Sequence, residues 1–294
     1  MAQFVFSAFA DEAGNTLDAQ IAALCRNGIR CIEPRAVNGK GILAQTDEEL
    51  CEIRRRLDEA GITVPSLGSP IGKYPIAEDF GPHLEDFRRA LKVCRVLGAP
   101  RMRMFSFFVG QDELAARRDE VLRRMNIMLD EAEEAGILLC HENESKIYGQ
   151  NPEEVEDLLC SLPRLRGIFD PANYVTNGCD PVRGIDVTLP SLEYMHIKDA
   201  LFGESYTIVP AGEGDGKIAD ALRKVDAARD GVVYLTLEPH LKIFGAFASI
   251  DEHELKGKYD FRTSDEAFDF AVRSLENVLR SIGFEKGENA TWKK

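Results

Sequence analysis

The chain has 294 residues, of which 44% are hydrophobic and 29% charged, and this ordinary globular composition excludes collagen-like, low-complexity and largely disordered proteins. Lys and Arg number 36 against 50 Asp and Glu, and the net charge of −14 argues against a nucleic acid partner, which needs a basic surface. The seven cysteines form no CxxC pair, and the apolar residues 1–10 are too short for a membrane span and lack a signal peptide's basic leader. We therefore expect a cytoplasmic protein with reduced thiols and no membrane partner.

Short apolar segments rich in β-branched residues alternate with longer segments of helical period. The expected strands, in chain order, are Phe4–Ala10, Cys31–Val37, Ile62–Ser69, Met102–Phe107, Ile137–Asn143, Gly167–Asn173, Tyr194–Ala200 and Val232–His240. The expected helices are Thr16–Asn27, Asp47–Ala60, Pro82–Leu97, Asp112–Ala135, Pro152–Cys160, Pro181–Thr188 (the weakest pattern), Ile218–Ala228 and Ser264–Ile282.

The alternation of strands and helices, with no antiparallel hairpin signal, predicts a parallel sheet. Gly28, Gly61, Gly98 and Gly136 each stand between a helix and the next strand, as left-handed helix caps do. Eight such units in 294 residues suit a closed (β/α)₈ barrel, the TIM barrel of the α/β class. A doubly wound open sheet is the alternative, but no G-x-G-x-x-G follows the first strand. No linker divides the chain, so we expect one domain over residues 1–294.

Four of the later strands are expected to end in a charged or titratable residue. These are Glu142 in ILLCHEN, Asp170 in GIFDPAN, His196 in YMHIKDA and Glu238 in VYLTLEPH. A charge inside a barrel strand is costly unless it is paired or bound to metal, and barrel active sites lie at the C-terminal strand ends. Three carboxylates and one imidazole suit Mn²⁺, Mg²⁺ or Co²⁺ better than a structural zinc. Any one of the four is equally explained as a helix cap, but together they indicate a metal site.

Seven motifs in order carry a resemblance to a known family: FSAFADE, CIEPRAV, CHENESKIYG, FDPANY, MHIKDA, AGEG and LTLEPHL. The sequence resembles the xylose-isomerase-like TIM barrel superfamily of sugar phosphate isomerases and epimerases. The resemblance implies that Glu142, Asp170, His196 and Glu238 bind one divalent ion, with Mn²⁺ favoured and Mg²⁺, Co²⁺ or Zn²⁺ as alternatives. It also implies that Glu142 and Glu238 are the catalytic acid and base, and that the protein is a homo-oligomer, a dimer or tetramer.

The function expected from this resemblance is a metal-dependent isomerase or epimerase of a ketose or sugar phosphate. The enzyme would remove a proton beside a carbonyl through a metal-stabilised enediolate. A lyase on a keto-sugar or keto-cyclitol, by dehydration or 3-keto-glycoside cleavage, stays open because the same intermediate can expel a leaving group. A sugar-binding barrel without chemistry also stays open. An endonuclease of the three-zinc type is disfavoured, because the ends of the third and fourth strands carry no histidines.

Six further side chains are expected to contact the substrate: Lys198, Asn173, Glu33, Arg35, His240 and Tyr148. Lys198 shares its side of the strand with His196 and so points into the pocket. Asn173 departs from related epimerases, which often carry a substrate-binding histidine at that position. Glu33 needs a cationic partner, which Arg35 or Arg103 could supply, and a buried ion pair is its alternative role.

Two loops complete the expectations. The glycine-rich residues 211–217 could form an anion-binding nest from successive backbone amides, with a flexible turn as the simpler interpretation. Asp199 faces away from the pocket by strand parity and is expected to orient a loop. Residues 241–262 form an unusually long connection after the eighth strand, which we expect to be a lid or a dimer contact.

Overall fold

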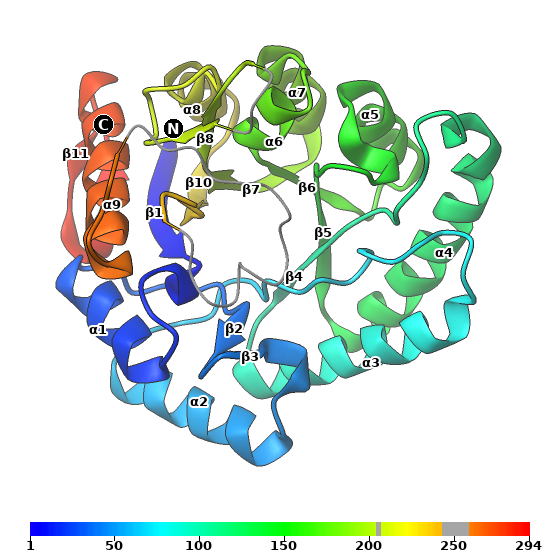
Figure 1. The fold of residues 1–294 in the computed structure, drawn as a ribbon, viewed down its shortest axis with the longest axis horizontal. Coiled ribbons are helices and arrows are strands. Elements are labelled where there is room, and N and C mark those ends of the chain that lie inside the picture. The colour runs from blue at the N-terminus through cyan, green and yellow to red at the C-terminus, as the bar shows by residue number, and fades with distance from the viewer. Residues whose placement is uncertain (204–206, 243–258) are drawn as a thin grey trace.

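The computed structural model describes residues 1–203, 207–242 and 259–294. Six parallel strands form most of the barrel wall, and helices surround them (Figure 1). In the order in which they pair, the strands are β1 (Ala2–Ala8), β10 (Gly231–Leu237), β7 (Leu192–Ile197), β6 (Arg166–Phe169), β5 (Leu138–Glu142) and β4 (Arg101–Met104). The helices are α1 (Leu17–Arg26), α2 (Asp47–Glu59), α3 (Phe80–Leu97), α4 (Leu114–Ala135), α5 (Pro152–Ser161), α6 (Pro171–Thr176), α7 (Pro181–Thr188), α8 (Ile218–Ala228) and α9 (Ser264–Ser281).

Two extended segments close the barrel between β1 and β4, but neither forms a regular strand. The backbone hydrogen bonds that make this closure join Glu33 to Ala8, Ile32 to Thr63 and Leu67 to Arg101. The prediction of regular strands over Cys31–Val37 and Ile62–Ser69 is therefore wrong. Pro34 and Pro65 interrupt both segments, and proline has no N–H to donate to a sheet. The (β/α)₈ barrel itself is confirmed, since both segments occupy the expected places in the wall.

The expectation of a sheet without antiparallel hairpins is also wrong. Three short antiparallel pairs decorate the barrel: β2 with β3 (Ala36–Val37 and Lys40–Gly41), β8 with β9 (Asp199–Leu201 and Thr207–Val209), and β11 with β12 (Glu285–Lys286 and Thr291–Lys293). The turn between β2 and β3 is Asn38-Gly39, and both residues have the positive φ of a two-residue hairpin turn, so the sequence did carry a signal for this pair. The alternation therefore predicted the six parallel strands of the wall but none of the antiparallel pairs.

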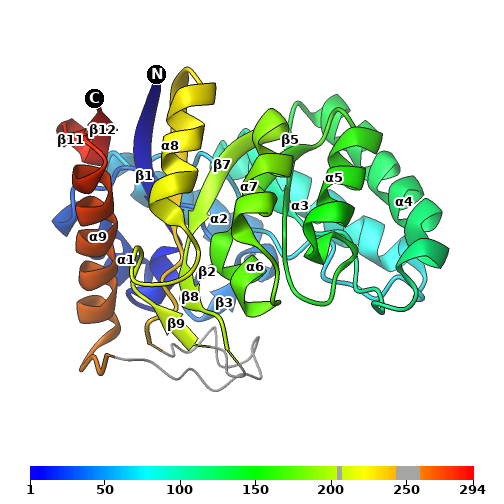
Figure 2. The same cartoon turned by 90° about the horizontal axis from the view of Figure 1, so that it is seen from above.

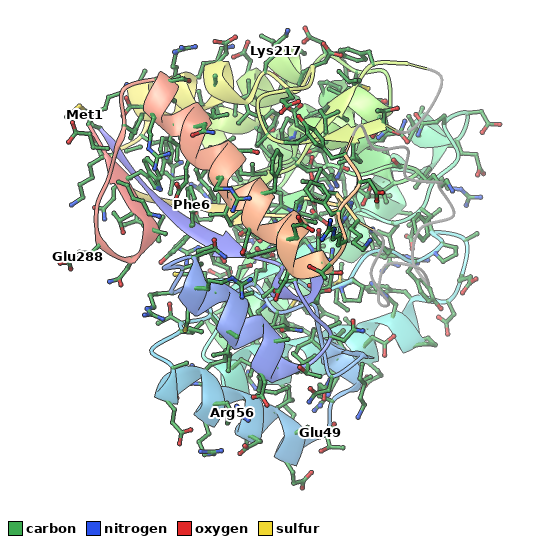
Figure 3. All side chains as sticks on the ribbon, turned by 60° about the vertical axis from the view of Figure 1, so that its left-hand side comes forward. Met1, Phe6, Glu49, Arg56, Lys217 and Glu288 are labelled. Carbon is green, nitrogen blue, oxygen red and sulfur yellow. The ribbon has the colours of Figure 1, made fainter. Side chains whose placement is uncertain are left out.

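The C-terminal hairpin becomes part of the wall, because β12 pairs antiparallel with the middle of β1 (Figures 2 and 3). Trp292 is fully buried, and its ring stacks on that of Phe6 with 5.7 Å between the centroids. β12 thus occupies the edge of β1 that a regular second strand would use. This explains why the segment around Glu33 meets β1 only at the C-terminal end, through Ala8.

The helix boundaries follow the predicted signals closely. Helix α8 has the predicted bounds, and the four cap glycines have φ between +66° and +71°, as a left-handed cap requires. One continuous core of apolar side chains runs from Ala2 to Trp292, so the described residues form one domain. Among the described helices, none combines the length and apolarity needed to cross a bilayer.

Candidate active site

Glu142, Asp170, His196 and Glu238, here called the strand-end cluster, meet at one end of the barrel. Glu142 is the last residue of β5, Asp170 and Glu238 directly follow β6 and β10, and His196 is the penultimate residue of β7. One ligand atom from each residue lies within 4.8 Å of the corresponding atoms of the other three, and all four side chains are buried. The structure therefore brings together the four residues that the sequence marked as metal ligands.

Asp170 shows how local structure aims one of these side chains. The predicted strand Gly167–Asn173 ends early, at Phe169, because Pro171 begins helix α6 and Asp170 caps it. The Asp170 Oδ1 atom accepts the backbone N–H of Asn173 at 3.0 Å, and this fixes the carboxylate. Its other oxygen, Oδ2, remains directed toward the strand-end cluster.

The chemistry of the strand-end cluster fits a divalent cation. Asp170 Oδ2 and Glu238 Oε2 are buried and accept no hydrogen bond from any described residue. The one ammonium of Lys198 lies 3.2 Å from Asp170 Oδ2 and 3.8 Å from Glu238 Oε2, and further positive charge at this place would offset the cost of burying both carboxylates. Three carboxylates and one imidazole form the mixed oxygen and nitrogen donor set of a catalytic dication. The residues present therefore fit the metal that the sequence predicts.

His196 lies between carboxylates on both of its ring nitrogens. Its Nδ1 atom is 2.8 Å from Glu142 Oε1 and 3.5 Å from Glu238 Oε2, while Nε2 is 3.3 Å from Glu33 Oε2. Burial alone would lower the pKa of His196, but Glu142 and Glu33 outweigh it and raise this pKa to about 10. The same two carboxylates thus favour a proton on each ring nitrogen in the absence of a metal, and a cation at Nδ1 would compete with the proton there.

Three cations surround these acids: Lys198 and Arg103 are buried, and Arg35 is partly buried. Lys198 Nζ lies 3.2 Å from Asp170 Oδ2 and 3.8 Å from Glu238 Oε2. Burial raises the pKa of Asp170 to about 7, against the opposing charge of Lys198. Arg103 Nη1 lies 3.1 Å from Glu142 Oε2, and Arg35 Nη1 lies 3.0 Å from Glu238 Oε1. Each glutamate thus has one oxygen held by an arginine and the other turned toward the strand-end cluster.

Of the six residues expected to contact the substrate, four lie beside the strand-end cluster. Lys198 and Arg35 lie beside the strand-end cluster, and Asn173 Nδ2 is 3.5 Å from Glu142 Oε1. His240 Nε2 is 3.2 Å from Glu238 Oε1, and burial is the main cause that lowers the pKa of His240 to about 4.

Tyr148 and Glu33 lie elsewhere. The Tyr148 hydroxyl donates to Asp157 in α5 at 2.8 Å, so it is directed to the helix layer rather than to the strand-end cluster. Glu33 is 0% exposed and lies behind His196, on the Nε2 side of its ring. The substrate contact expected for these two side chains stays a prediction.

Sequence reasoning missed two acids at the mouth, Asp11 and Glu12, which follow β1. Asp11 Oδ2 accepts Arg35 Nε at 3.0 Å, and Glu12 Oε2 accepts the backbone N–H of His240 at 2.7 Å. Burial raises the pKa of Glu12 to about 8, although Arg35 opposes it. The signal was present in the motif FSAFADE, because these acids stand at the end of the first strand just as Glu238 stands at the end of the last.

The glycine-rich loop offers its amides to the protein itself. Asp199 accepts the backbone N–H groups of Gly212, Gly214 and Gly216 at 2.9–3.0 Å, and that of Ala200 at 3.0 Å. A Cβ at residue 214 would lie 2.3 Å from Asp199 Oδ1, so glycine is needed there for space. The nest predicted for a substrate anion is thus filled by Asp199, which orients this loop as its strand parity predicted.

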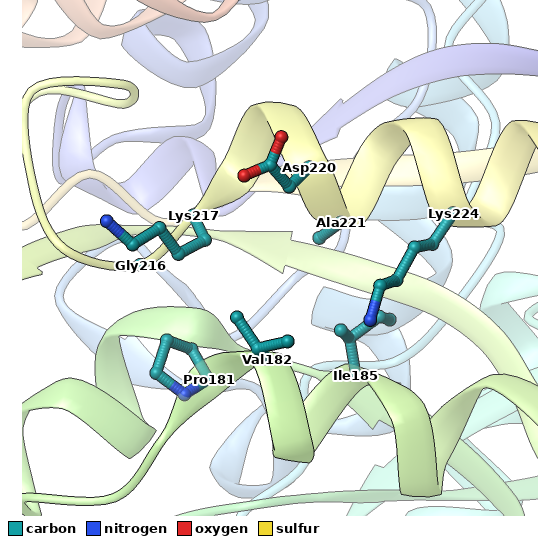
Figure 4. Close-up of a pocket in the computed structure, with 8 residues that line it drawn as sticks. All are labelled: Pro181, Val182, Ile185, Gly216, Lys217, Asp220, Ala221 and Lys224. Atoms are coloured by element: carbon teal, nitrogen blue, oxygen red, sulfur yellow. The ribbon is translucent and has the colours of Figure 1, made fainter.

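Two other regions lie apart from the strand-end cluster. A depression of about 350 Å³ opens between α7 and α8, where Val182 and Ile185 face Ala221 and Lys224 (Figure 4). It lies in the helix layer and is lined by none of the candidate site residues. Most of the predicted lid or dimer contact at 241–262 lies outside the described residues, so that expectation stays a prediction.

No curated protein matches the sequence at a significant level, but the fold is similar to that of several solved structures. D-psicose 3-epimerase, solved in the presence of D-fructose, gives a TM-score of 0.69 at 19% identity, covering 95% of this chain and 99% of that chain. The probable 3-DHS dehydratase AsbF from Bacillus anthracis gives 0.69 at 13% identity, covering 94% and 99%. The IOLI protein, solved with a bound zinc atom, gives 0.71 at 13% identity, covering 95% and 99%. At these identities the similarity establishes the fold and not the reaction.

A protein-family model described as the xylose isomerase-like TIM barrel matches residues 21–253. The matched span contains every residue of the strand-end cluster and the wall from the second segment to β10. The match confirms the resemblance that the sequence motifs indicated. The chain belongs to the xylose isomerase-like TIM barrel family.

Proposed function

We propose that the chain is a divalent-metal-dependent isomerase or epimerase that acts on a ketose or a sugar phosphate. The observation that carries this proposal is the arrangement of two glutamates around one histidine. Glu142 and Glu238 come from strands at the two ends of the series β10, β7, β6 and β5. Both carboxylates nevertheless reach within 3.5 Å of His196 Nδ1. Two carboxylates that close to one metal site support the proposal, because one could remove a proton beside a carbonyl and the other return it.

The strand-end cluster would hold the cation, with Mn²⁺ favoured and Mg²⁺, Co²⁺ or Zn²⁺ as alternatives. A dication at this place stabilises negative charge that develops on the carbonyl and hydroxyl oxygens of a bound sugar. Lys198, 3% exposed, would hold a further substrate oxygen through its ammonium group. Asn173 would donate to a hydroxyl, and Arg35 and His240 would border the substrate beside Glu238.

The two glutamates divide the proton transfer. One carboxylate takes the proton from the carbon next to the carbonyl, and the C–H electron pair moves toward the carbonyl oxygen. The other glutamate, protonated at the start, returns a proton to the opposite face of that carbon, and the product is the epimer. Return of a proton to the former carbonyl carbon, with the proton of the neighbouring hydroxyl passing to the former carbonyl oxygen, gives the isomer instead. Arg103 and Arg35 each hold one oxygen of a glutamate, so both carboxylates are oriented before the substrate binds.

A lyase is the second candidate, and the position of Lys198 favours it. Its buried ammonium lies beside Asp170 and Glu238, where it could protonate a departing hydroxyl or glycoside oxygen after the α-proton is removed. The probable dehydratase AsbF has the same TM-score to this chain as the epimerase has. The two candidates share the first step and differ in whether a β-leaving group is expelled.

The test is incubation of the protein and Mn²⁺ with a panel of ketoses and keto-cyclitols in D₂O. Deuterium at the α-carbon without loss of water supports the isomerase or epimerase, and loss of water or an aglycone supports the lyase. Glu142→Gln and Glu238→Gln should each lower turnover by at least about 100-fold with an unchanged circular dichroism spectrum. Glu193→Gln, in the same strand as His196 but near its start, is the matched control and should retain activity. No exchange with any substrate would contradict both candidates.

The proposal also covers the substrate class, the cell compartment and the oligomeric state. The substrate is a small sugar or sugar-derived molecule, and we propose a cytoplasmic dimer or tetramer. Light scattering coupled to size-exclusion chromatography tests the oligomeric state.

A further inference from the structure

Glu33 is a buried carboxylate with three protein donors around it. The Tyr194 hydroxyl donates to Oε1 at 2.9 Å, and the Thr236 hydroxyl donates to Oε2 at 2.9 Å. His196 Nε2 lies 3.3 Å from the same Oε2 atom. The Tyr194 hydroxyl is itself 2.9 Å from that of Ser66, so the network extends to the third segment of the wall. The carboxylate is therefore fixed in place by side chains from several elements.

These contacts determine which ring nitrogen of His196 is available to bind a metal. A neutral imidazole has one N–H and one lone pair, and the partner of the first nitrogen decides which nitrogen keeps the lone pair. Without a metal, both nitrogens face a carboxylate, Glu142 Oε1 at 2.8 Å from Nδ1 and Glu33 Oε2 at 3.3 Å from Nε2. A cation held by Glu142 and Glu238 would take the place of the proton on Nδ1, and Glu33 would keep the proton on Nε2. Nδ1 is the atom that faces Glu142 and Glu238. Phe9 packs edge-on against the ring, with 5.0 Å between centroids, and limits its rotation.

We propose that Glu33 is a positioning residue for the metal centre: it holds His196 as the Nε2–H tautomer and aims Nδ1 at the cation. This inference rests on the proposed function, since it requires a metal at the strand-end cluster. It is an alternative to the substrate contact expected for Glu33, whose side chain is 0% exposed and contacts His196 Nε2. Outer carboxylates that orient a ligating histidine typically contribute about 10- to 100-fold to metal affinity.

The decisive comparison is between two conservative variants that alter the same network. Glu33→Gln keeps the shape of the side chain and removes its charge, and we expect the Zn²⁺ dissociation constant to rise about 10- to 100-fold. Tyr194→Phe removes one hydrogen bond to Glu33 and leaves the contact with His196, so the constant should change by less than about threefold. Zn²⁺ affinity is measured by competition with a chelator, and circular dichroism checks the fold of each variant.

A second measurement uses the wild-type protein, so it does not depend on whether Glu33→Gln folds. In the wild-type protein labelled with ¹⁵N-histidine and loaded with Zn²⁺, the signals of His196 should report a metal on Nδ1 and a proton on Nε2. The signals are assigned by their loss in His196→Asn. Zinc is chosen because it is diamagnetic.

The outcomes separate this inference from the function on which it rests. A wild type that binds zinc while Glu33→Gln binds it within threefold overturns the role of Glu33 and leaves the metal enzyme intact. So does zinc bound to Nε2 of His196. A wild type that binds neither Zn²⁺ nor Mn²⁺ overturns the metal centre itself, and the role of Glu33 with it.

Discussion

Asp199→Asn should destabilise the protein strongly, because one side chain organises the whole glycine-rich loop. Asp199 Oδ2 accepts from Gly212 and Gly214, and Oδ1 accepts from Gly216 and Ala200. Asparagine offers one acceptor oxygen, so its NH₂ group would face two backbone N–H groups and satisfy neither. Hydrogen bonds to a charged group contribute about 1.5–3 kcal/mol each, so the loss of two amounts to about 3–6 kcal/mol.

The assay is urea unfolding followed by circular dichroism and by the fluorescence of Trp292, the single tryptophan. With an m-value of about 3 kcal/mol/M, the midpoint should fall by about 1–2 M. Asp215→Asn is the matched control in the same loop, because Asp215 accepts one exposed N–H, that of Phe202, at 2.9 Å. We expect it to cost less than about 1 kcal/mol. Equal midpoints for the two variants would refute the reasoning that Asp199 holds the loop.

Three further predictions concern the cation, the pH and the barrel wall. Mn²⁺ at 100 times its dissociation constant should stabilise the protein by about 2.7 kcal/mol and raise Tm by about 5 °C. EDTA should reverse both effects, and an unchanged Tm in a thermal melt would contradict the metal site. Burial alone would raise the pKa of Asp269, but hydrogen bonds from Arg26 and Asn27 lower it below its ordinary 3.8. The stabilisation that Asp269 contributes is therefore complete above about pH 4 and is lost as the pH falls through its folded pKa. The difference between the urea midpoints at pH 6 and pH 3 should be smaller in Arg26→Met than in the wild type. An equal difference in the two proteins would exclude this ion pair as the cause. Trp292→Ala should cost about 3–5 kcal/mol in unfolding free energy, and a loss under 1 kcal/mol would show that β12 does not support the wall.

The sequence predicted most of the fold because alternation and glycine caps are local signals. Helix α8 and the four cap glycines needed no knowledge of distant residues. The prediction of regular strands in the second and third wall segments failed for a non-local reason as well as a local one. Pro34 could be recognised as a strand breaker, but nothing near it shows that β12, some 250 residues later, covers the edge of β1.

The candidate site was predictable to the extent that strand ends converge. Glu142, Asp170, His196 and Glu238 could be grouped because each ends a successive strand. The partner of an inward side chain could not be assigned, because strand parity gives a direction and no contact. Arg103, expected as a partner for Glu33, lies against Glu142 instead.

The pairing of β12 with β1 also bears on how the chain folds during synthesis. The middle of one edge of β1 stays unpaired until residues near Trp292 are made, and an exposed strand edge is a template for association with other chains. Contacts this distant in sequence also slow folding, because a long loop must close before they form. Chaperone dependence during expression should therefore be concentrated in the interval before this last hairpin emerges.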